Sequence, residues 1–178
     1  MLINTNLSVC LHRMKFKKSV NHIKFSNNGR YFSVCLGRHV QIWSTPSSRR
    51  DFSPFVIIHT FTGHTEDVTR CEWSKSDGYV MTSSGDNTAR VYMINGEREY
   101  VVKTLAGHRE RVVGGMWEEG ENLAYTVSGD GAVFTWGYEV GGKGYGGEGF
   151  QLKTKHYLKQ EGSKVTGERG GGGGETMR

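Results

Sequence analysis

The sequence lacks the features of a membrane-spanning or secreted protein. None of its apolar runs approaches the roughly 18 residues that a transmembrane helix requires. The opening residues, 1–6, have neither the basic start nor the apolar core of a secretory signal peptide. We therefore expect a soluble, intracellular protein that does not associate with a membrane.

Cysteine is scarce and carries no pairing signal. The three cysteines are an odd number and form no C-x-x-C pair. Cys35 and Cys71 lie inside apolar strand patterns, which favours buried, reduced thiols. Reduced thiols are typical of proteins that work in a reducing compartment.

Signatures of catalysis and of metal binding are also missing. No G-x-S-x-G elbow surrounds Ser128, whose neighbours are Thr126, Val127 and Gly129. The seven histidines include no H-x-x-x-H or other tight ligand spacing, so the sequence gives no support for a metal site. We therefore expect a protein that is not an enzyme and that takes no cofactor, metal ion or small-molecule substrate.

One glycine motif resembles a cofactor signature but lacks its context. Gly142, Gly144 and Gly147 fit the G-x-G-x-x-G pattern of dinucleotide-binding proteins. That pattern has meaning only between a strand and a helix N-terminus, and no helix start follows here. We interpret residues 141–149 as a flexible, glycine-rich loop.

The sequence does contain an internal repeat. The dipeptide Gly-His occurs at Gly63-His64 and again at Gly107-His108, 44 residues later. A period of about 40–45 residues with this signature is typical of a WD40 β-propeller blade, a unit that binds partners. Each copy continues with matching residue types at matching intervals, namely Val68 to Trp73, Ser84, Asp86 and Tyr92 in one copy and Val112 to Trp117, Ser128, Asp130 and Trp136 in the other.

The alternation of apolar and polar residues predicts short strands, and nothing resembles an amphipathic helix, so the expected fold class is all-β. Propellers close with roughly 4–8 blades, and only three are recognisable, so we expect an incomplete WD40 β-propeller from a longer chain. The expected organisation is the outer strand of a preceding blade in residues 1–19, blade 1 in 20–62, blade 2 in 63–106, blade 3 in 107–166 with its glycine-rich loop at 141–149, and a disordered tail in 167–178.

Each complete blade is predicted to have four strands, and residues 7–16 and 163–165 are expected to belong to neighbouring blades. The predicted strands are 20–25, 31–35, 40–43 and 55–61 in blade 1, 68–73, 79–82, 89–92 and 100–105 in blade 2, and 112–117, 123–128, 133–136 and 150–158 in blade 3.

Histidine, serine and aspartate recur together in two blades, which argues against a hydrolase triad, because catalytic sets are not usually duplicated in each repeat. We predict instead a buried hydrogen-bond chain, in which Asp accepts from His, His meets the Ser hydroxyl, and Ser reaches the indole N–H of a Trp. The predicted members are His64, Ser84, Asp86 and Tyr92 in blade 2 and His108, Ser128, Asp130 and Trp136 in blade 3.

The blades differ in how much of this chain they keep. Blade 3 has every member, whereas blade 2 has Tyr92 in place of the tryptophan. Blade 1 keeps only Trp43, with Cys35 and Gly37 at the expected positions of serine and aspartate. We therefore expect blade 3 to be the most rigid.

A formal net charge of +5 allows an acidic partner such as RNA. Two basic runs are candidates for contact with RNA or another partner. The interpretation that we favour is that these residues lie on the solvated side of outer strands, where lysines block edge pairing. The candidate contacts are Arg13, Lys15, Lys17 and Lys18 in one run and Lys153 and Lys155 in the other.

An ordered set of short motifs in residues 7–166 resembles the amino-terminal propeller of the periodic tryptophan protein 2 family. The set departs from the family pattern after Thr166, where the first strand of another blade should continue. The motifs are Leu11-His12-Arg13 with Phe16-Lys17, Val20 to Phe25 with Gly29-Arg30, Arg50-Asp51-Phe52 with Pro54-Phe55, Gly63-His64-Thr65 through Cys71-Glu72-Trp73, Gly107-His108-Arg109, Tyr125 to Ser128 with Asp130-Gly131, Lys155-His156-Tyr157 and Lys164-Val165-Thr166.

This resemblance implies a non-catalytic scaffold in ribosome biogenesis. Members of the family are long nucleolar proteins with two propellers and a helical tail, and they are subunits of the small-subunit processome. There they help to bind the 5′ external transcribed spacer and the snoRNA particle during 18S rRNA maturation. The implied partners are other WD40 and processome proteins, with pre-rRNA and snoRNA bound directly or through them, in the nucleolus of the nucleus.

The main alternative is a WD40 adaptor of another pathway, such as a ubiquitin ligase or a chromatin complex, because a fold alone does not fix function. The two interpretations differ in what should copurify: a ligase or chromatin subunit in one case, pre-rRNA with snoRNA in the other.

Overall fold

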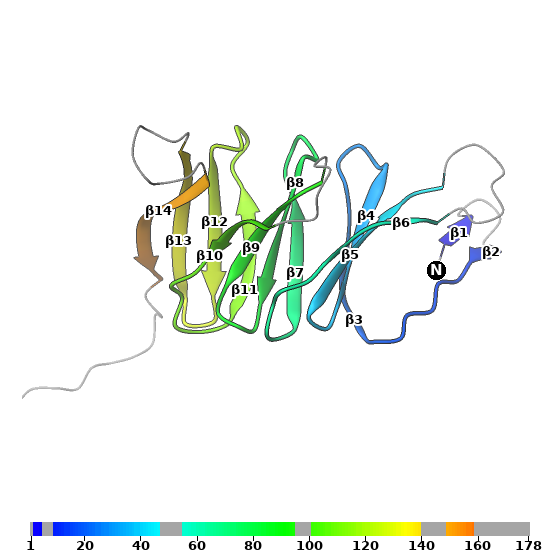
Figure 1. Cartoon of the computed structure of the whole chain (residues 1–178), viewed down its shortest axis with the longest axis horizontal. Coiled ribbons are helices and arrows are strands. Elements are labelled where there is room, and N and C mark those ends of the chain that lie inside the picture. Colours follow the sequence, from blue (N-terminus) through cyan, green and yellow to red (C-terminus); the bar gives the residue numbers. More distant parts are fainter. Residues whose placement is uncertain (1, 5–8, 47–54, 95–100, 140–148, 159–178) are drawn as a thin grey trace, which may run out of the picture.

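Every regular element in the described part of the chain is a β-strand (Figure 1). The structure, a computed structural model, describes residues 2–4, 9–46, 55–94, 101–139 and 149–158. No helix able to cross a membrane occurs within these ranges.

The strands form three four-stranded antiparallel sheets that stand side by side as blades (Figure 1). In each sheet the strands are neighbours in chain order, as in a propeller blade. The WD40 β-propeller fold class is therefore confirmed for the three blades. Blade 1 contains β3 (Val20–Phe25), β4 (Tyr31–Leu36), β5 (His39–Ser44) and β6 (Ile57–Phe61), blade 2 contains β7 (Val68–Trp73), β8 (Tyr79–Ser84), β9 (Ala89–Met93) and β10 (Val101–Leu105), and blade 3 contains β11 (Val112–Trp117), β12 (Leu123–Ser128), β13 (Ala132–Glu139) and β14 (Gly149–Tyr157).

The strand positions follow the apolar alternation closely, with one larger difference. The predicted strands 68–73, 112–117 and 123–128 coincide with β7, β11 and β12. Strand β13 extends three residues beyond the predicted end at residue 136. Its ladder with β14 continues to the pair Glu139 and Gly149, so backbone pairing rather than side-chain alternation sets the end of this strand.

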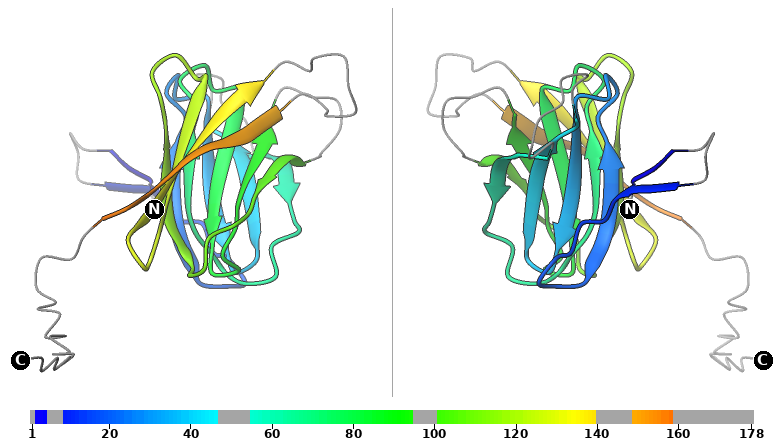
Figure 2. Two further views of the ribbon diagram at one scale, coloured as in Figure 1. Left: turned by 90° about the vertical axis from the view of Figure 1, so that its left-hand side faces the viewer. Right: turned by 90° about the vertical axis from the view of Figure 1, so that its right-hand side faces the viewer.

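The expected outer strand in residues 7–16 is shorter in the structure. Strand β2 covers Val9–His12 and pairs with β1, Leu2–Asn4, in a separate two-stranded sheet, and residues 13–16 are not part of a strand. This hairpin projects from the side of the stacked blades (Figure 2). The glycine-rich stretch 141–148, the expected strand at 163–165 and the expected tail at 167–178 lie outside the described residues.

Two apolar cores hold the three blades together. Successive residues of a strand point to opposite faces of the sheet, so each blade presents one apolar set to each neighbour. Between blades 1 and 2 the buried set includes Cys35, Ile42 and Trp73. Between blades 2 and 3 it includes Met81, Val91, Val112, Phe134 and Trp136.

The outer face of blade 1 is only partly covered. Met14 and Phe16 pack against a buried cluster on this face, formed by Phe32, Val34 and Leu36. On the neighbouring strand β3, the apolar side chains of Val20, Ile23 and Phe25 are 36%, 48% and 58% exposed. Within the described residues no further blade covers β3 on this face.

Candidate functional site

The polar residues that recur in each blade form buried hydrogen-bond chains. In blade 2, His64 Nδ1 lies 2.8 Å from Asp86 Oδ2, and His64 Nε2 lies 2.8 Å from the hydroxyl of Thr82. Burial lowers the pKa of His64, so the neutral ring donates from Nδ1 to Asp86 and accepts from Thr82 at Nε2. Burial alone would raise the pKa of Asp86, but hydrogen bonds from Thr88, His64 and the Thr65 backbone lower it to about 2.

Blade 3 has a different part of the same hydrogen-bond chain. The indole N–H of Trp136 donates to Thr126 Oγ1 at 2.9 Å, and Thr126 in turn lies 2.7 Å from His108 Nε2. The other ring nitrogen, His108 Nδ1, is buried without a partner among the described residues. Asp130 does not reach it and accepts instead from the hydroxyl of Ser128 and the backbone N–H of Ala132.

The prediction that serine provides the hydroxyl of the chain is therefore wrong. Thr82 and Thr126 take that role, two residues before Ser84 and Ser128 on the same strand. The serines lie where the second strand enters the turn, so their hydroxyls bond to the turn: Ser128 to Asp130, and Ser84 to the carbonyl of Glu66 and the N–H of Asp86.

One related expectation also needs correction. In blade 2 the Tyr92 hydroxyl donates to the carbonyl of Thr62 at 3.3 Å and also interacts with the side chain of Thr82, the central hydroxyl of the hydrogen-bond chain. The expectation that blade 3 holds the complete chain fails as well, since it lacks the histidine–aspartate bond. Blade 2 has the carboxylate without the indole, and blade 3 has the indole without the carboxylate.

In blade 1 the register differs by one residue from the sequence alignment of the blades. Leu36 lies opposite Val20, as Ser84 lies opposite Val68, so Leu36 rather than Cys35 occupies the serine position. The indole of Trp43 donates to Gln41 Oε1 at 3.2 Å. Blade 1 therefore has no counterpart of the histidine-centred chain.

The structure does not bring the two predicted basic runs together. Arg13, Lys15, Lys17 and Lys18 are exposed in the segment that leads into β3, at one end of the row of blades (Figure 1). The second run lies on β14 at the other end. There the Lys155 ammonium lies 4.9 Å from the centroid of the Phe134 ring, a cation–π distance that gives this lysine a packing role.

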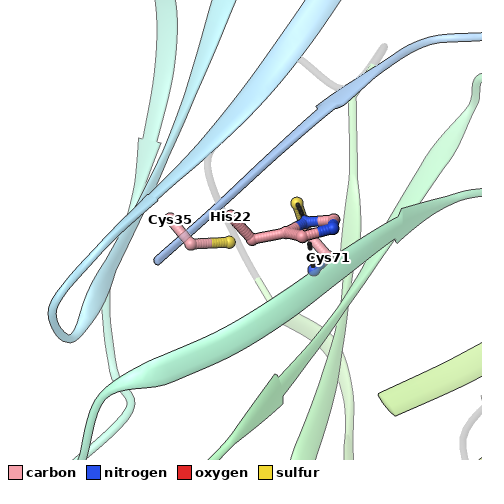
Figure 3. A group of neighbouring side chains, drawn as sticks. All are labelled: His22, Cys35 and Cys71. Carbon is pink, nitrogen blue, oxygen red and sulfur yellow. Dashed lines mark hydrogen bonds between the residues drawn. The ribbon is translucent and has the colours of Figure 1, made fainter. Parts of the chain in front are cut away.

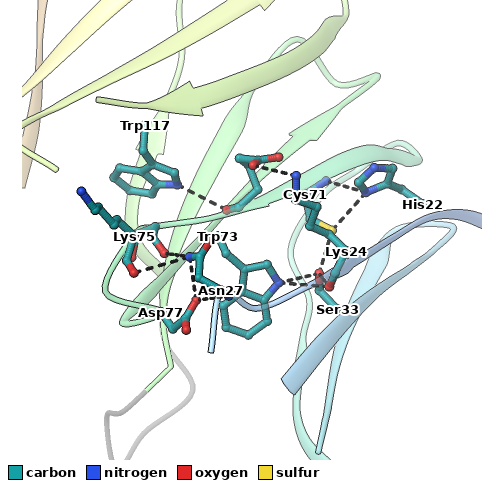
Figure 4. Close-up of polar contacts among 11 residues, drawn as sticks. His22, Lys24, Asn27, Ser33, Cys71, Trp73, Lys75, Asp77 and Trp117 are labelled. Atoms are coloured by element: carbon teal, nitrogen blue, oxygen red, sulfur yellow. Dashed lines mark hydrogen bonds and ion pairs between the residues drawn. The ribbon is translucent and has the colours of Figure 1, made fainter. Parts of the chain in front are cut away.

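A repeated carboxylate contact links the turns of neighbouring blades. Asp77 Oδ1 and Oδ2 accept from the backbone N–H groups of Asn27 and Asn28 at 2.7 and 2.8 Å (Figure 4 shows Asn27 beside Asp77). In the next blade Glu121 accepts in the same way from the N–H and hydroxyl of Ser76. Both carboxylate residues have left-handed backbone, with φ of 59°, which aims the side chain back at the preceding blade.

One cluster escaped the sequence reasoning. His22, Cys35 and Cys71 place one nitrogen and two sulfur atoms within 4.8 Å of one another (Figure 3). Both cysteines are buried free thiols, as predicted. Hydrogen bonds from Cys35, His22 and Ser33 lower the pKa of Cys71, whereas the bond with Cys71 and burial raise that of Cys35. The only sequence signal was that both cysteines lie on apolar strand faces.

The chain is similar to known WD40 proteins. The family model described as "WD domain, G-beta repeat" matches residues 8–44 and 55–92. The periodic tryptophan protein 2 homolog of Neurospora crassa is 37% identical over an alignment of 178 positions, which covers 92% of this chain and 20% of that protein. The homolog of Schizosaccharomyces pombe is 40% identical over 87 residues, which cover 48% of this chain and 10% of that protein.

Periodic tryptophan protein 2 of Saccharomyces cerevisiae is 36% identical over 115 residues, which cover 57% of this chain and 12% of that protein. The chain thus spans between 10% and 20% of the length of these three relatives. The three blades and the match across 92% of the sequence agree with one another. The chain belongs to the periodic tryptophan protein 2 family of WD40-repeat proteins.

Proposed function

We propose that this chain is part of a non-catalytic scaffold that assembles the small-subunit processome on pre-rRNA in the nucleolus and so supports 18S rRNA maturation. The observation that carries the proposal is the family match over 92% of the chain. The implied partners are other WD40 and processome proteins, with pre-rRNA and snoRNA bound directly or through those proteins.

The chemistry of the blades supports a scaffold over an enzyme. The side chains that resemble a triad, His64, Asp86, His108 and Ser128, are engaged in hydrogen bonds inside the blades. Both histidines are buried, with exposed fractions of 5% and 7%. A nucleophile and its base must reach a substrate, and these groups instead satisfy one another, which favours a structural role.

The exposed basic residues supply a direct route to RNA that can be tested separately. Arg13, Lys15, Lys17 and Lys18 are exposed, and four cations close together in sequence attract a phosphate backbone. Lys155 already packs on an aromatic ring, so we assign RNA contact to the first run.

The test is a copurification and depletion experiment with the full-length protein in cells. We expect a tagged protein to concentrate in the nucleolus and to copurify with pre-rRNA, snoRNA and small-subunit assembly factors. Depletion should lower 18S rRNA and leave the large-subunit rRNA largely intact. Recovery of ubiquitin-ligase or chromatin subunits, with unchanged 18S rRNA after depletion, would overturn the proposal in favour of an adaptor in another pathway.

Direct RNA contact is tested by charge reversal. A variant with Lys15, Lys17 and Lys18 changed to Glu should retain its protein partners but recover less crosslinked pre-rRNA. Lys155→Glu is the matched control, because it removes a cation that packs on Phe134 at the other end of the row of blades. Equal losses of RNA crosslinking in the two variants would contradict the assignment to the first run.

A further inference from the structure

We propose that His22, Cys35 and Cys71 bind one Zn²⁺ ion, which links the first blade to the second. The three residues come from three strands of two blades: β3, β4 and β7. Two thiolates and one imidazole are a donor set that favours Zn²⁺ over Mg²⁺ or Ca²⁺. This proposal is independent of the proposed function.

Local backbone geometry explains why the three side chains converge. His22 lies directly opposite Cys35 in the β3–β4 ladder, just after an irregularity in the register. Residues paired across antiparallel strands project to the same face, and on this face Cys35 belongs to the core shared with blade 2. Cys71 projects from blade 2 into the same core, so the imidazole and both thiols meet at the interface.

The distances are close to those of an occupied site. Zn–S bonds of about 2.3 Å and Zn–N bonds of about 2.0–2.1 Å in a tetrahedral site place neighbouring ligand atoms about 3.5–3.8 Å apart. His22 Nδ1 and Cys71 Sγ are already 3.4 Å apart. Because all three donor atoms lie within 4.8 Å of one another, the widest pair needs to close by only about 1 Å.

His22 Nδ1 faces Cys71 and lies 3.4 Å from both its sulfur and its backbone nitrogen. In the neutral tautomer that carries its proton on Nε2, the Nδ1 lone pair faces the cluster and can bind the metal. Metal binding requires loss of the two thiol protons, and the two thiolates then balance the charge of Zn²⁺ in a buried setting.

A second layer of hydrogen bonds holds one sulfur in place. Ser33 Oγ lies 3.0 Å from Cys71 Sγ and accepts from the indole N–H of Trp73 at 3.1 Å (Figure 4). The Ser33 hydroxyl also donates to the carbonyl of Lys24 at 3.0 Å, so the indole and the strand together hold this oxygen beside the Cys71 sulfur. Partners of this kind orient ligands and tune metal affinity.

The cluster is specific to the first interface and does not arise from the repeat itself. By ladder position, the counterparts of His22, Cys35 and Cys71 at the second interface are Arg70, Ser83 and Gly115. At that interface the Met81 side chain lies against Gly115. A side chain at position 115 would place its Cβ only 2.6 Å from the Met81 Cε, so a cysteine does not fit there without a shift of Met81. The second interface therefore offers no matching ligand set.

The test is metal binding by the whole chain, purified metal-free under reducing conditions. Co²⁺ serves as the spectroscopic probe, and Zn²⁺ is titrated in competition with it. We expect one Co²⁺ per chain, with thiolate-to-cobalt charge-transfer absorption that stoichiometric Zn²⁺ abolishes. We also expect Zn²⁺ to raise the thermal midpoint, because the ion binds the folded interface.

Cys35→Ser, Cys71→Ser and His22→Gln should each weaken Zn²⁺ binding by at least tenfold, and the cysteine variants should lose the charge-transfer band. Cys10→Ser, which changes the remaining cysteine of the sequence, is the matched control and should bind as the parent chain does. His22 is only partly buried, so His22→Gln tests ligation with little risk to folding.

Three results would overturn the proposal. One is a parent chain that takes up neither ion. Another is binding that survives loss of Cys35 and Cys71 or disappears with Cys10→Ser. The third is a parent chain in which Cys35 and Cys71 are recovered as a disulfide under reducing conditions that leave Cys10 free, with no metal uptake.

Discussion

Replacing the Thr126 hydroxyl tests which residue connects the histidine to the tryptophan in blade 3. Thr126 is fully buried and lies 2.7 Å from His108 Nε2 and 2.9 Å from Trp136 Nε1. Thr126→Val keeps the volume nearly unchanged but removes the hydroxyl, so both nitrogens lose their partner. A buried polar group left without a partner costs about 1–3 kcal/mol, so two such groups predict a loss of about 2–6 kcal/mol.

The matched variant is Ser128→Ala, two residues along the same strand. Ser128 bonds to Asp130, whose side chain is at the surface, and water replaces that bond after the change. We expect a loss of about 1 kcal/mol, the ordinary net value of one hydrogen bond. The order of the two variants therefore separates the structural arrangement from the sequence-based hypothesis, in which Ser128 is the connecting hydroxyl.

The assay is urea unfolding followed by circular dichroism, in which a lower midpoint at constant slope reports lost stability. A double variant, Thr126→Val with Trp136→Phe, adds a further check. Trp136→Phe removes the donor that Thr126→Val leaves unpaired. The double variant should therefore lose less stability than the two single variants lose in total. A larger loss in Ser128→Ala than in Thr126→Val would refute the reasoning.

Two further perturbations address protonation and the contact between turns. Burial lowers the pKa of His64 and of His108, so the unfolded chain binds more protons, and the free energy of unfolding should fall as the pH drops through about 6.5. His22, whose pKa is raised mainly by its bond to Cys71, acts in the opposite direction, and a urea midpoint that rises between pH 7.5 and 5.5 would contradict the dominance of the two buried rings. Asp77→Ala removes the acceptor of the Asn27 and Asn28 N–H groups and should cost about 3–6 kcal/mol, since a hydrogen bond to a carboxylate contributes about 1.5–3 kcal/mol. Asp77→Gly should cost less, because glycine adopts the φ of 59° without strain. Urea midpoints in which the glycine variant is the less stable would argue against a strained backbone at this position.

The contact at Asp77 also explains how a non-glycine residue comes to have left-handed backbone. Gly29, in the corresponding turn of blade 1, has φ of 69°. Asp77 and Glu121 adopt a similar conformation and each gains hydrogen bonds to the preceding blade. Hydrogen bonds to a carboxylate, worth about 1.5–3 kcal/mol each, exceed the roughly 1–2 kcal/mol cost of the conformation. The neighbouring blade therefore stabilises a turn that is unfavourable in isolation.

The sequence by itself determined the blades and their strands. Side chains of a strand alternate between two faces, and both faces of an inner blade are covered, so the apolar pattern and the 44-residue interval locate β7, β11 and β12 to the residue. The burial of Cys35 and Cys71 followed from the same pattern. Local chemistry was sufficient in these cases because strand formation and burial depend on residues close together in the chain.

Only the tertiary structure decided which polar groups meet. Thr126 and Ser128 project from the same face of one strand, so a period of two residues cannot distinguish them; the positions of Trp136 and His108 across the sheet select Thr126. The cluster of His22, Cys35 and Cys71 depends on the register of β3 against β4 and on the approach of a second blade. Both outcomes are fixed by packing between strands that are distant in sequence, where angstrom-scale shifts decide which atoms come within hydrogen-bond or metal-ligand distance.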